Sequence, residues 1–157
     1  MRRSWRARPL SVIAVASDHA GAELKNFLAD ELRAKGFEVL DLGTNGPASV
    51  DYPDYGYKLA EALATGRAAR GVAVCGSGIG ISIALNRHPH VRAALVHDHL
   101  TARLSRMHND ANVLVLGGRL TGVETARDCL AAFLDTPYEG GRHAGRVAKL
   151  GNPPSKP

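Results

Sequence analysis

The sequence predicts an α/β fold, a three-layer Rossmann-like sandwich with a mostly parallel five-stranded sheet. From Val12 onward, short aliphatic runs alternate with longer segments of helical period, which is typical of parallel strands joined by crossover helices. The runs are aliphatic or β-branched almost throughout, as expected for strands buried on both faces. The predicted strands cover residues 12–16, 38–42, 71–75, 91–96 and 113–116.

Helical periodicity fills the intervals between these strands. The first helix is expected over residues 22–34, and Gly36 directly after it supplies a stop signal. Its apolar stripe consists of Leu24, Phe27, Leu28 and Leu32. Further helices are expected at residues 55–65, 80–87, 100–108 and 123–134. A short basic helix is expected last, with Arg142, Arg146 and Lys149 on one face.

The length of 157 residues is that of one ordinary domain. No internal repeat and no linker divides the chain, so we expect a single domain over residues 12–150. A disordered basic extension (1–11) is expected before it and a proline-rich flexible tail (151–157) after it.

Composition limits the kinds of partner that the protein could bind and the cellular compartment in which it is expected. The formal charge of +5 falls to +1 without the four arginines of the extension, so the domain lacks the basic stripe that binds nucleic acid. No apolar run approaches the roughly 18 residues that span a bilayer, so no membrane partner is expected. Cys75 and Cys129 form no pairing pattern, which favours the cytoplasm. Cys129 lies on the apolar stripe of its helix and is interpreted as a small buried hydrophobe.

The residues that follow the strands are the candidates for chemistry, because ligands bind beyond the carboxyl ends of open parallel sheets. Asp18 and His19 follow the first strand, and the glycine-rich run 75–80 follows the third. Residues 97–99 follow the fourth strand, and Arg119 closely follows the fifth. The sequence therefore predicts a ligand site at this edge of the sheet.

The run Cys75-Gly76-Ser77-Gly78-Ile79-Gly80 predicts an anion-binding loop. Its glycines expose backbone N–H groups at the start of a helix, where the helix dipole favours negative charge. It is not a dinucleotide fingerprint, because Ile81 stands where the last glycine of G-x-G-x-x-G is required, and no Gly-Lys-Ser/Thr of a Walker loop follows. Asp98 lies about one βα unit further on, which keeps a nucleotide-binding module open as an alternative.

Cys75 is the candidate reactive thiol. It stands between a strand and a helix N-terminus, a position that favours thiolate, although a buried strand-end cysteine is often inert. His108 and Asn109, just before the fifth strand, could transfer a proton and hold an oxyanion, or simply end a helix. A papain-like hydrolase is disfavoured, because the aromatic residue and second cysteine of that family's signature are missing.

Six short motifs occur in order along the chain. They are Asp18-His19-Ala20-Gly21, Asp41-Leu42-Gly43-Thr44, Asp51-Tyr52-Pro53, Cys75-Gly76-Ser77-Gly78-Ile79-Gly80, Ser105-Arg106-Met107-His108-Asn109-Asp110 and Tyr138-Glu139-Gly140-Gly141-Arg142-His143. With these motifs, over about residues 12–150, the chain resembles type B ribose 5-phosphate isomerase. The resemblance implies an aldose–ketose isomerase of the pentose phosphate pathway that interconverts ribose 5-phosphate and ribulose 5-phosphate through an enediolate.

The resemblance also implies roles for the residues of the site. Cys75 would be the base that moves a proton between C1 and C2, and His108 would assist opening of the furanose ring. Asn109 and the amides of the glycine loop would hold the enediolate oxygen, with Ser77 touching the substrate. The implied substrate-binding residues are Asp18, His19, Tyr52, Gly76, Gly78, Gly80, Arg119, Arg142 and Arg146, of which the arginines would take the phosphate.

A homodimer or dimer of dimers is implied as well, with each active site completed by the neighbouring subunit. No cofactor is implied, and no metal ion is expected, since the close histidine pairs at 88/90 and 97/99 lack a third ligand at a recognisable spacing. Two alternatives stay open. One is an isomerase of a six-carbon sugar phosphate, such as galactose 6-phosphate or allose 6-phosphate, and the other is a non-catalytic nucleotide-binding domain of flavodoxin-like architecture.

Overall fold

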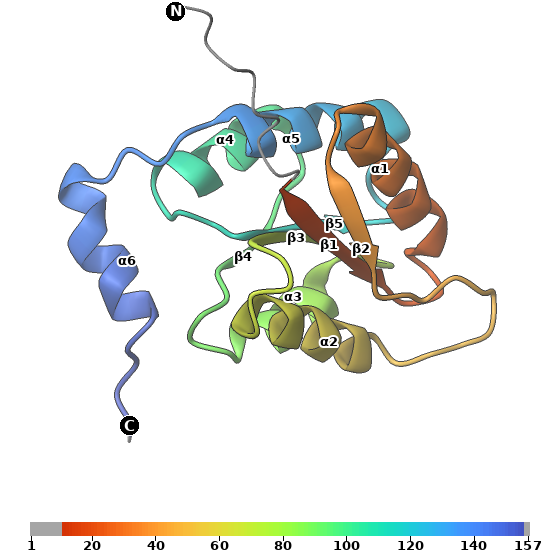
Figure 1. The fold of residues 1–157 in the computed structure, drawn as a ribbon, viewed down its shortest axis with the longest axis horizontal. Helices are drawn as coiled ribbons and strands as arrows, with labels where there is room; N and C mark the ends of the chain where they lie inside the picture. The colour runs from red at the N-terminus through yellow and green to blue at the C-terminus, as the bar shows by residue number, and fades with distance from the viewer. Residues whose placement is uncertain (1–10, 156–157) are drawn as a thin grey trace, which may run out of the picture.

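A computed structural model describes residues 11–155, in which one sheet lies between two layers of helices (Figure 1). The elements are β1 (Val12–Ser17), α1 (Ala22–Ala34), β2 (Glu38–Asp41), α2 (Tyr52–Ala64), β3 (Arg70–Cys75), α3 (Ile79–Asn86), β4 (Ala93–Leu95), α4 (His99–Met107), β5 (Val113–Gly117), α5 (Val123–Asp135), the 3-10 turn η1 (Gly141–His143) and α6 (Ala144–Leu150). The predicted α/β class is confirmed. The predicted basic extension, apart from Ser11, and residues 156–157 of the predicted tail lie outside the described residues.

The five strands are parallel to one another in the order β2-β1-β3-β5-β4, so this sheet is fully rather than mostly parallel. Ser17 pairs with Val74 and Cys75 with Gly117, which brings the carboxyl ends of the three central strands to one edge. The chain moves outward from β1 to β2 and then returns past β1 to β3. Since ligands bind where the direction of such crossovers reverses, the crevice between β1 and β3 is the expected ligand site.

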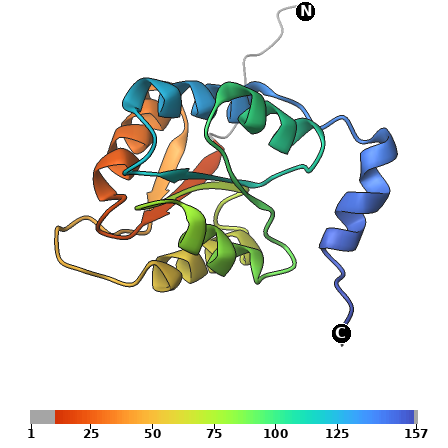
Figure 2. The ribbon, with the colours of Figure 1, turned by 180° about the vertical axis from the view of Figure 1, so that it is seen from behind.

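Helices α1, α4 and α5 cover one face of the sheet, and α2 and α3 cover the other (Figures 1 and 2). On the first face, Leu32 and Phe133 are fully buried, as are Leu59 and Ile81 on the second. In α5, Val123 begins the helix and is about half exposed, so the buried face of this helix starts at Ala126. No helix in the described part of the chain has the length and apolar character of a membrane span.

Lys25 is a buried charge that the apolar pattern of α1 does not reveal. Its side chain is 0% exposed, and its ammonium donates to Asp41 Oδ1 at 2.8 Å and to Asn45 Oδ1 at 2.6 Å. The ion pair of Lys25 with Asp41 ties α1 to the segment after β2, because Asp41 Oδ1 also accepts the N–H of Gly43. A buried ammonium is stable only when its N–H groups are hydrogen-bonded, and Asp41 and Asn45 accept these hydrogen bonds.

Lys25→Met should therefore destabilise the fold by about 2 kcal/mol, because it leaves Asp41 and Asn45 without their shared donor. The urea midpoint of unfolding measures the loss. Lys35→Met, at the exposed end of the same helix, is the matched control and should change stability by less than about 0.5 kcal/mol. Equal midpoints for the two variants would contradict the assigned role of Lys25.

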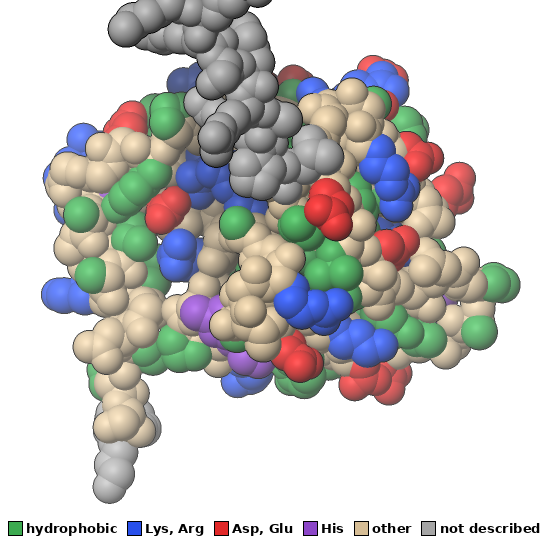
Figure 3. Space-filling view, in the orientation of Figure 1, with side chains coloured by type: hydrophobic (Ala, Val, Ile, Leu, Met, Phe, Trp, Pro, Cys, Tyr) green, Lys and Arg blue, Asp and Glu red, His purple; other side chains and the backbone are tan. Residues whose placement is uncertain are grey.

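Helix α6 stands apart from the layered body, beyond the β4 edge of the sheet (Figures 1 and 2). None of its residues is buried, and Leu150 is 54% exposed. Apolar side chains are visible at the surface of this region, at the left of the view in Figure 3. A helix with uncovered apolar residues generally needs a further surface to pack against.

Candidate active site

A cleft of about 650 Å³ opens at the carboxyl edge of the sheet, over the crevice between β1 and β3. It is lined by Asp18, His19, Ala20, Tyr52, Cys75, Gly76, Ser77, Ile79, Gly80, Ile83, Arg119 and Leu120. Eight residues predicted for the site from the sequence are among these, drawn from four segments of the chain. The topology thus brings together side chains that are far apart in the sequence.

Cys75 ends β3 at the floor of the cleft. Its side chain lines the cavity, although the residue is only 4% exposed. The N–H of Gly78 donates to Cys75 Sγ at 3.2 Å, which holds the sulfur under the amide-rich loop at the start of α3. A donated N–H and the positive end of a helix dipole both stabilise negative charge on a thiolate.

The glycines of this loop are required by its geometry. Gly78 has φ +78°, and a Cβ there would lie 2.5 Å from Leu95 Cδ1 and 3.0 Å from the carbonyl carbon of Leu116. A Cβ on Gly80 would lie 2.5 Å from the ring of Tyr52, so the first residue of α2 packs directly against the loop. Ser77 Oγ accepts the N–H of Ile79 at 3.2 Å. The loop therefore has a fixed shape, which an anion-binding cradle needs.

Asp18 and His19 form the opposite wall, at the end of β1. Asp18 is buried, and its Oδ1 accepts the N–H of Gly21 at 3.0 Å, which fixes the turn into α1. His19 Nδ1 accepts the N–H of Val50 at 3.1 Å, so a neutral ring carries its proton on Nε2. That tautomer leaves one donor on His19 for a ligand in the cleft.

Arg119 supplies the positive charge of the cleft. Its N–H donates to the carbonyl of Gly76 at 2.9 Å, and the N–H of Gly118 donates to the carbonyl of Cys75 at 2.8 Å. These bonds join the segment after β5 to the glycine loop. The Arg119 side chain lies above that loop, because a Cβ on Gly76 would be 3.5 Å from its guanidinium carbon. An anion in the cleft would therefore meet both backbone amides and a guanidinium.

His108 and Asn109 do not reach this cleft within one chain. They follow α4, which returns to the amino edge of the sheet, and they precede β5, whose last residue pairs with Cys75. The five residues of β5 rise about 3.3 Å each, so the two edges are roughly 13 Å apart. Asn109 instead lines a separate cavity of about 340 Å³ beside β4 and Leu150.

The turn that carries His108 and Asn109 is held in place by a partly buried network of ion pairs and hydrogen bonds. Asp110 adopts a left-handed backbone (φ +46°) that a residue other than glycine seldom takes. Arg106, which is almost fully buried, donates to Asp110 Oδ1 at 2.9 Å, and Arg92 Nε donates to the Asp110 carbonyl at 2.8 Å. These bonds explain why arginine and aspartate flank the His-Asn pair in the motif.

Arg142 and Arg146 are likewise outside the cleft of their own chain. Arg142 lies in η1 and Arg146 in the detached helix α6, and both are exposed. The structure thus divides the predicted site residues into two groups. One lies in the cleft, and the other lies on surfaces from which a second chain could be reached.

The cleft also has an apolar rim that the sequence analysis missed. Ile79 and Ile83 lie one turn apart on α3 and are 53% and 55% exposed, and Leu120 beside them is 63% exposed. The signal was available, since α3 is apolar on more than its core face. Exposed aliphatic side chains gathered at one place indicate an interaction surface.

The fold and the cleft together define an enzyme that acts on a small anionic substrate, with a thiol, an amide-lined loop and a guanidinium at the switch point of a parallel sheet. Comparison with known proteins narrows this class. A family model described as Ribose/Galactose Isomerase matches residues 13–150. The chain therefore belongs to the ribose/galactose isomerase family.

Individual relatives agree with this assignment. The ribose-5-phosphate isomerase B of Escherichia coli K12 is 44% identical over 138 residues, which are 88% of this chain and 93% of that protein. A D-erythrulose-4-phosphate isomerase of Pectobacterium atrosepticum is 40% identical over 140 residues, which are 88% and 92% of the two chains. The solved structure of Clostridium thermocellum ribose-5-phosphate isomerase B has a TM-score of 0.88 at 50% identity, and the match covers 89% of this chain and 95% of that chain.

These findings decide between the classes that the sequence left open. The predicted resemblance and the prediction of an enzyme of the sugar-phosphate isomerase class are confirmed. The alternative of a non-catalytic nucleotide-binding domain is wrong, because the match to an isomerase family extends over nearly the whole chain.

Proposed function

We propose that this protein interconverts ribose 5-phosphate and ribulose 5-phosphate through an enediolate, with Cys75 as the base. One observation carries the proposal. Cys75 lines the switch-point cleft, and its sulfur accepts a backbone N–H from the loop that would hold the substrate oxygen. A base and an oxyanion cradle side by side are the two parts that proton transfer next to a carbonyl needs.

The chemistry follows from these parts. In ring opening, His108 would transfer protons so that the bond between C1 and the ring oxygen breaks, the C1 hydroxyl loses its proton and the ring oxygen gains one. The Cys75 thiolate then removes the proton from C2 of the open aldehyde, and the enediolate oxygen is held by the loop amides and Asn109. The thiol returns the proton to C1 while the hydroxyl proton passes from O2 to O1, which leaves the ketose.

The phosphate would be bound by arginines. Arg119 lies in the same chain as Cys75, and the remaining cations would be Arg142 and Arg146. Guanidinium groups suit this role because their planar N–H groups pair with phosphate oxygens. A phosphate held far from C1 and C2 fixes the reacting carbons over the sulfur.

A homodimer would complete the site. In each chain the cleft has the thiol but lacks His108, Asn109, Arg142 and Arg146, which lie at the opposite edge, in η1 and on α6. A twofold axis that brings the exposed isoleucines of α3 together would cover the apolar rim and give α6 a surface to pack on. The two free, buried cysteines are consistent with a cytoplasmic enzyme.

The test is an isomerase assay on ribose 5-phosphate with a chelator present. We expect turnover that does not depend on added metal, because the proposed acid, base and oxyanion donors are all protein groups. Absence of any conversion of ribose 5-phosphate or ribulose 5-phosphate by the folded protein would refute the proposed reaction.

A six-carbon sugar phosphate is the second candidate substrate, favoured by the galactose in the description of the matching family. The four-carbon sugar named for one relative widens the range to be tested. Each added carbon changes the distance between the phosphate and the reacting carbons. We expect kcat/KM for ribose 5-phosphate to exceed that for D-erythrose 4-phosphate, D-allose 6-phosphate and D-galactose 6-phosphate by about tenfold or more. A higher kcat/KM for one of the other three sugar phosphates would make that sugar the substrate in place of ribose 5-phosphate.

A further inference from the structure

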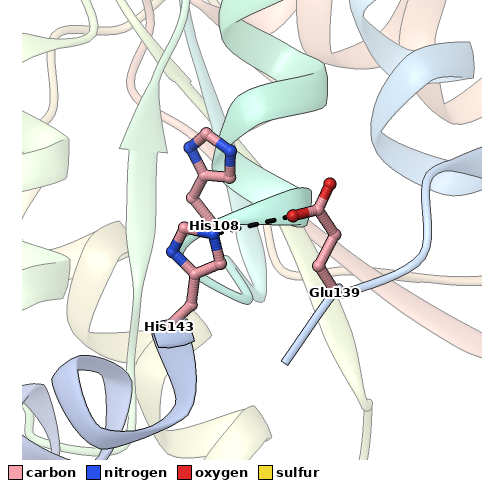
Figure 4. Close-up of side chains that lie close together, drawn as sticks. All are labelled: His108, Glu139 and His143. Carbon is pink, nitrogen blue, oxygen red and sulfur yellow. Dashed lines mark ion pairs between the residues drawn. The ribbon is translucent and has the colours of Figure 1, made fainter. Parts of the chain in front are cut away.

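His143 lies against the imidazole of His108, although no step of the proposed reaction uses it. The two rings are stacked, with centroids 4.4 Å apart and planes 16° from parallel. His143 is 6% exposed, and its Nε2 lies 3.6 Å from Glu139 Oε2, within range of an ion pair but beyond hydrogen-bond length. Figure 4 shows the two rings next to each other and a dashed line from the Glu139 carboxylate to the His143 ring.

The local sequence is organised to build this contact. The N–H of Glu139 donates to the carbonyl of Met107 at 3.1 Å, which anchors the segment to the end of α4 beside His108. Gly140 and Gly141 then adopt φ +64° and +55°, a left-handed pair that reverses the chain with little strain only for glycine. The N–H of His143 donates to the carbonyl of Gly140 at 3.0 Å and closes the turn. This turn places His143 next to His108.

Stacking explains the arrangement of His108, Glu139 and His143 better than metal binding does. The ligand atoms of His108, Glu139 and His143 lie within 4.8 Å of one another, as they would around an ion. Zinc, however, is bound by the in-plane lone pair of each imidazole, and stacking confines these lone pairs to two separate, nearly parallel planes rather than directing them to one point. Burial and the neighbouring Arg142 also lower the pKa of His143, which favours its neutral form.

We propose that His143 is a positioning residue that holds the His108 imidazole by stacking, in the orientation needed for ring opening. The inference rests on the proposed function, because it concerns the residue assigned to that step. A flat ring packed against one face of His108 restricts rotation of its imidazole. Such restriction matters for proton transfer, where a displacement of about 1 Å can cost about 100-fold in rate.

Two assays separate ring opening from proton transfer. Ribose 5-phosphate is mainly a furanose and must be opened, whereas ribulose 5-phosphate is acyclic because its O5 carries the phosphate. Removing the stacked ring with His143→Ala should therefore lower kcat from ribose 5-phosphate about tenfold or more, and leave the exchange of the C1 hydrogen of ribulose 5-phosphate with deuterated solvent, which needs no ring step, within about twofold. His143→Phe keeps a flat ring without nitrogen atoms and should retain most of the activity in both assays.

The experiment measures kcat and KM from ribose 5-phosphate and the C1 deuterium exchange of ribulose 5-phosphate, with chelator, for the wild type, His143→Ala, His143→Phe and His108→Asn, after confirming equal melting temperature and oligomeric state. Unchanged kcat in His143→Ala, equal loss in both assays, or no recovery in His143→Phe would each overturn the stacking role. A raised KM with unchanged kcat would mean that His143 positions Arg142 instead, which also overturns it.

The controls separate this inference from the function on which it rests. A wild-type protein inactive on both sugars would refute the proposed reaction itself. If His108→Asn lost activity specifically on ribose 5-phosphate and His143→Ala did not, only the stacking role would be overturned. If His108→Asn showed no such specific loss, the proposed ring-opening role of His108 would be wrong, and the inference with it. A wild-type rate that falls on chelation would point to a bound metal and overturn stacking.

Discussion

Cys75→Ala is expected to abolish isomerisation while ribose 5-phosphate still binds. A positioned base contributes about 10²- to 10⁴-fold to a rate, and alanine leaves no group in the cleft that could replace the sulfur at this position. Binding should persist, because the bonds of Gly118 and Arg119 to the loop carbonyls and of Ile79 to Ser77 do not use the thiol, and only the Gly78 N–H loses its acceptor. Turnover by coupled assay and binding by calorimetry measure the two effects, and wild-type turnover in Cys75→Ala would refute the thiol as base.

Cys129 provides the matched control. It is fully buried between α5 and the sheet, and burial, with smaller contributions from Asp128 and Asp98, raises the pKa of its thiol to about 11. It should therefore stay protonated and unreactive near neutral pH. Cys129→Ala should keep full turnover, and iodoacetamide should label Cys75 alone, more slowly when substrate is bound. Labelling of Cys129 before Cys75 would contradict the assignment of the reactive thiol.

Much of the fold could be predicted from the sequence because its signals are local. Aliphatic runs and helical period placed every strand and helix of the layered body to within a few residues. β4 was the least accurate of the strands, since it spans only Ala93–Leu95 whereas the aliphatic run extends over residues 91–96. Periodicity records which residues are apolar, and it cannot show where an edge strand stops pairing.

The candidate site could be predicted only in part. The cleft residues follow strands, and the rule that ligands bind beyond carboxyl ends was enough to group Asp18, Cys75 and Arg119. The buried charge of Lys25 was missed because one polar residue barely alters the apolar stripe of α1, and its acceptors are distant in sequence. The stacking of His143 on His108 depends on the positive φ of two glycines, a conformation that composition does not specify.

The separation of Cys75 from His108 leads to a prediction about the assembly. Cys75→Ala and His108→Ala homodimers should each be nearly inactive on ribose 5-phosphate. A heterodimer with one chain of each kind, isolated with two affinity tags, should regain about half of the wild-type activity. If each site takes its thiol from one chain and its histidine from the other, one site of the heterodimer carries both substitutions and the other carries none.

Pairing Cys75→Ala with Arg119→Ala gives the opposite expectation and serves as the control. Both residues line the cleft of a single chain, so each site of that heterodimer has one defect and no activity should return. If the site were built within one chain, the heterodimer of Cys75→Ala and His108→Ala would be equally inactive, which would contradict the shared site. The expectation rests on the proposed dimer, because the length of β5 separates the two residues within one chain.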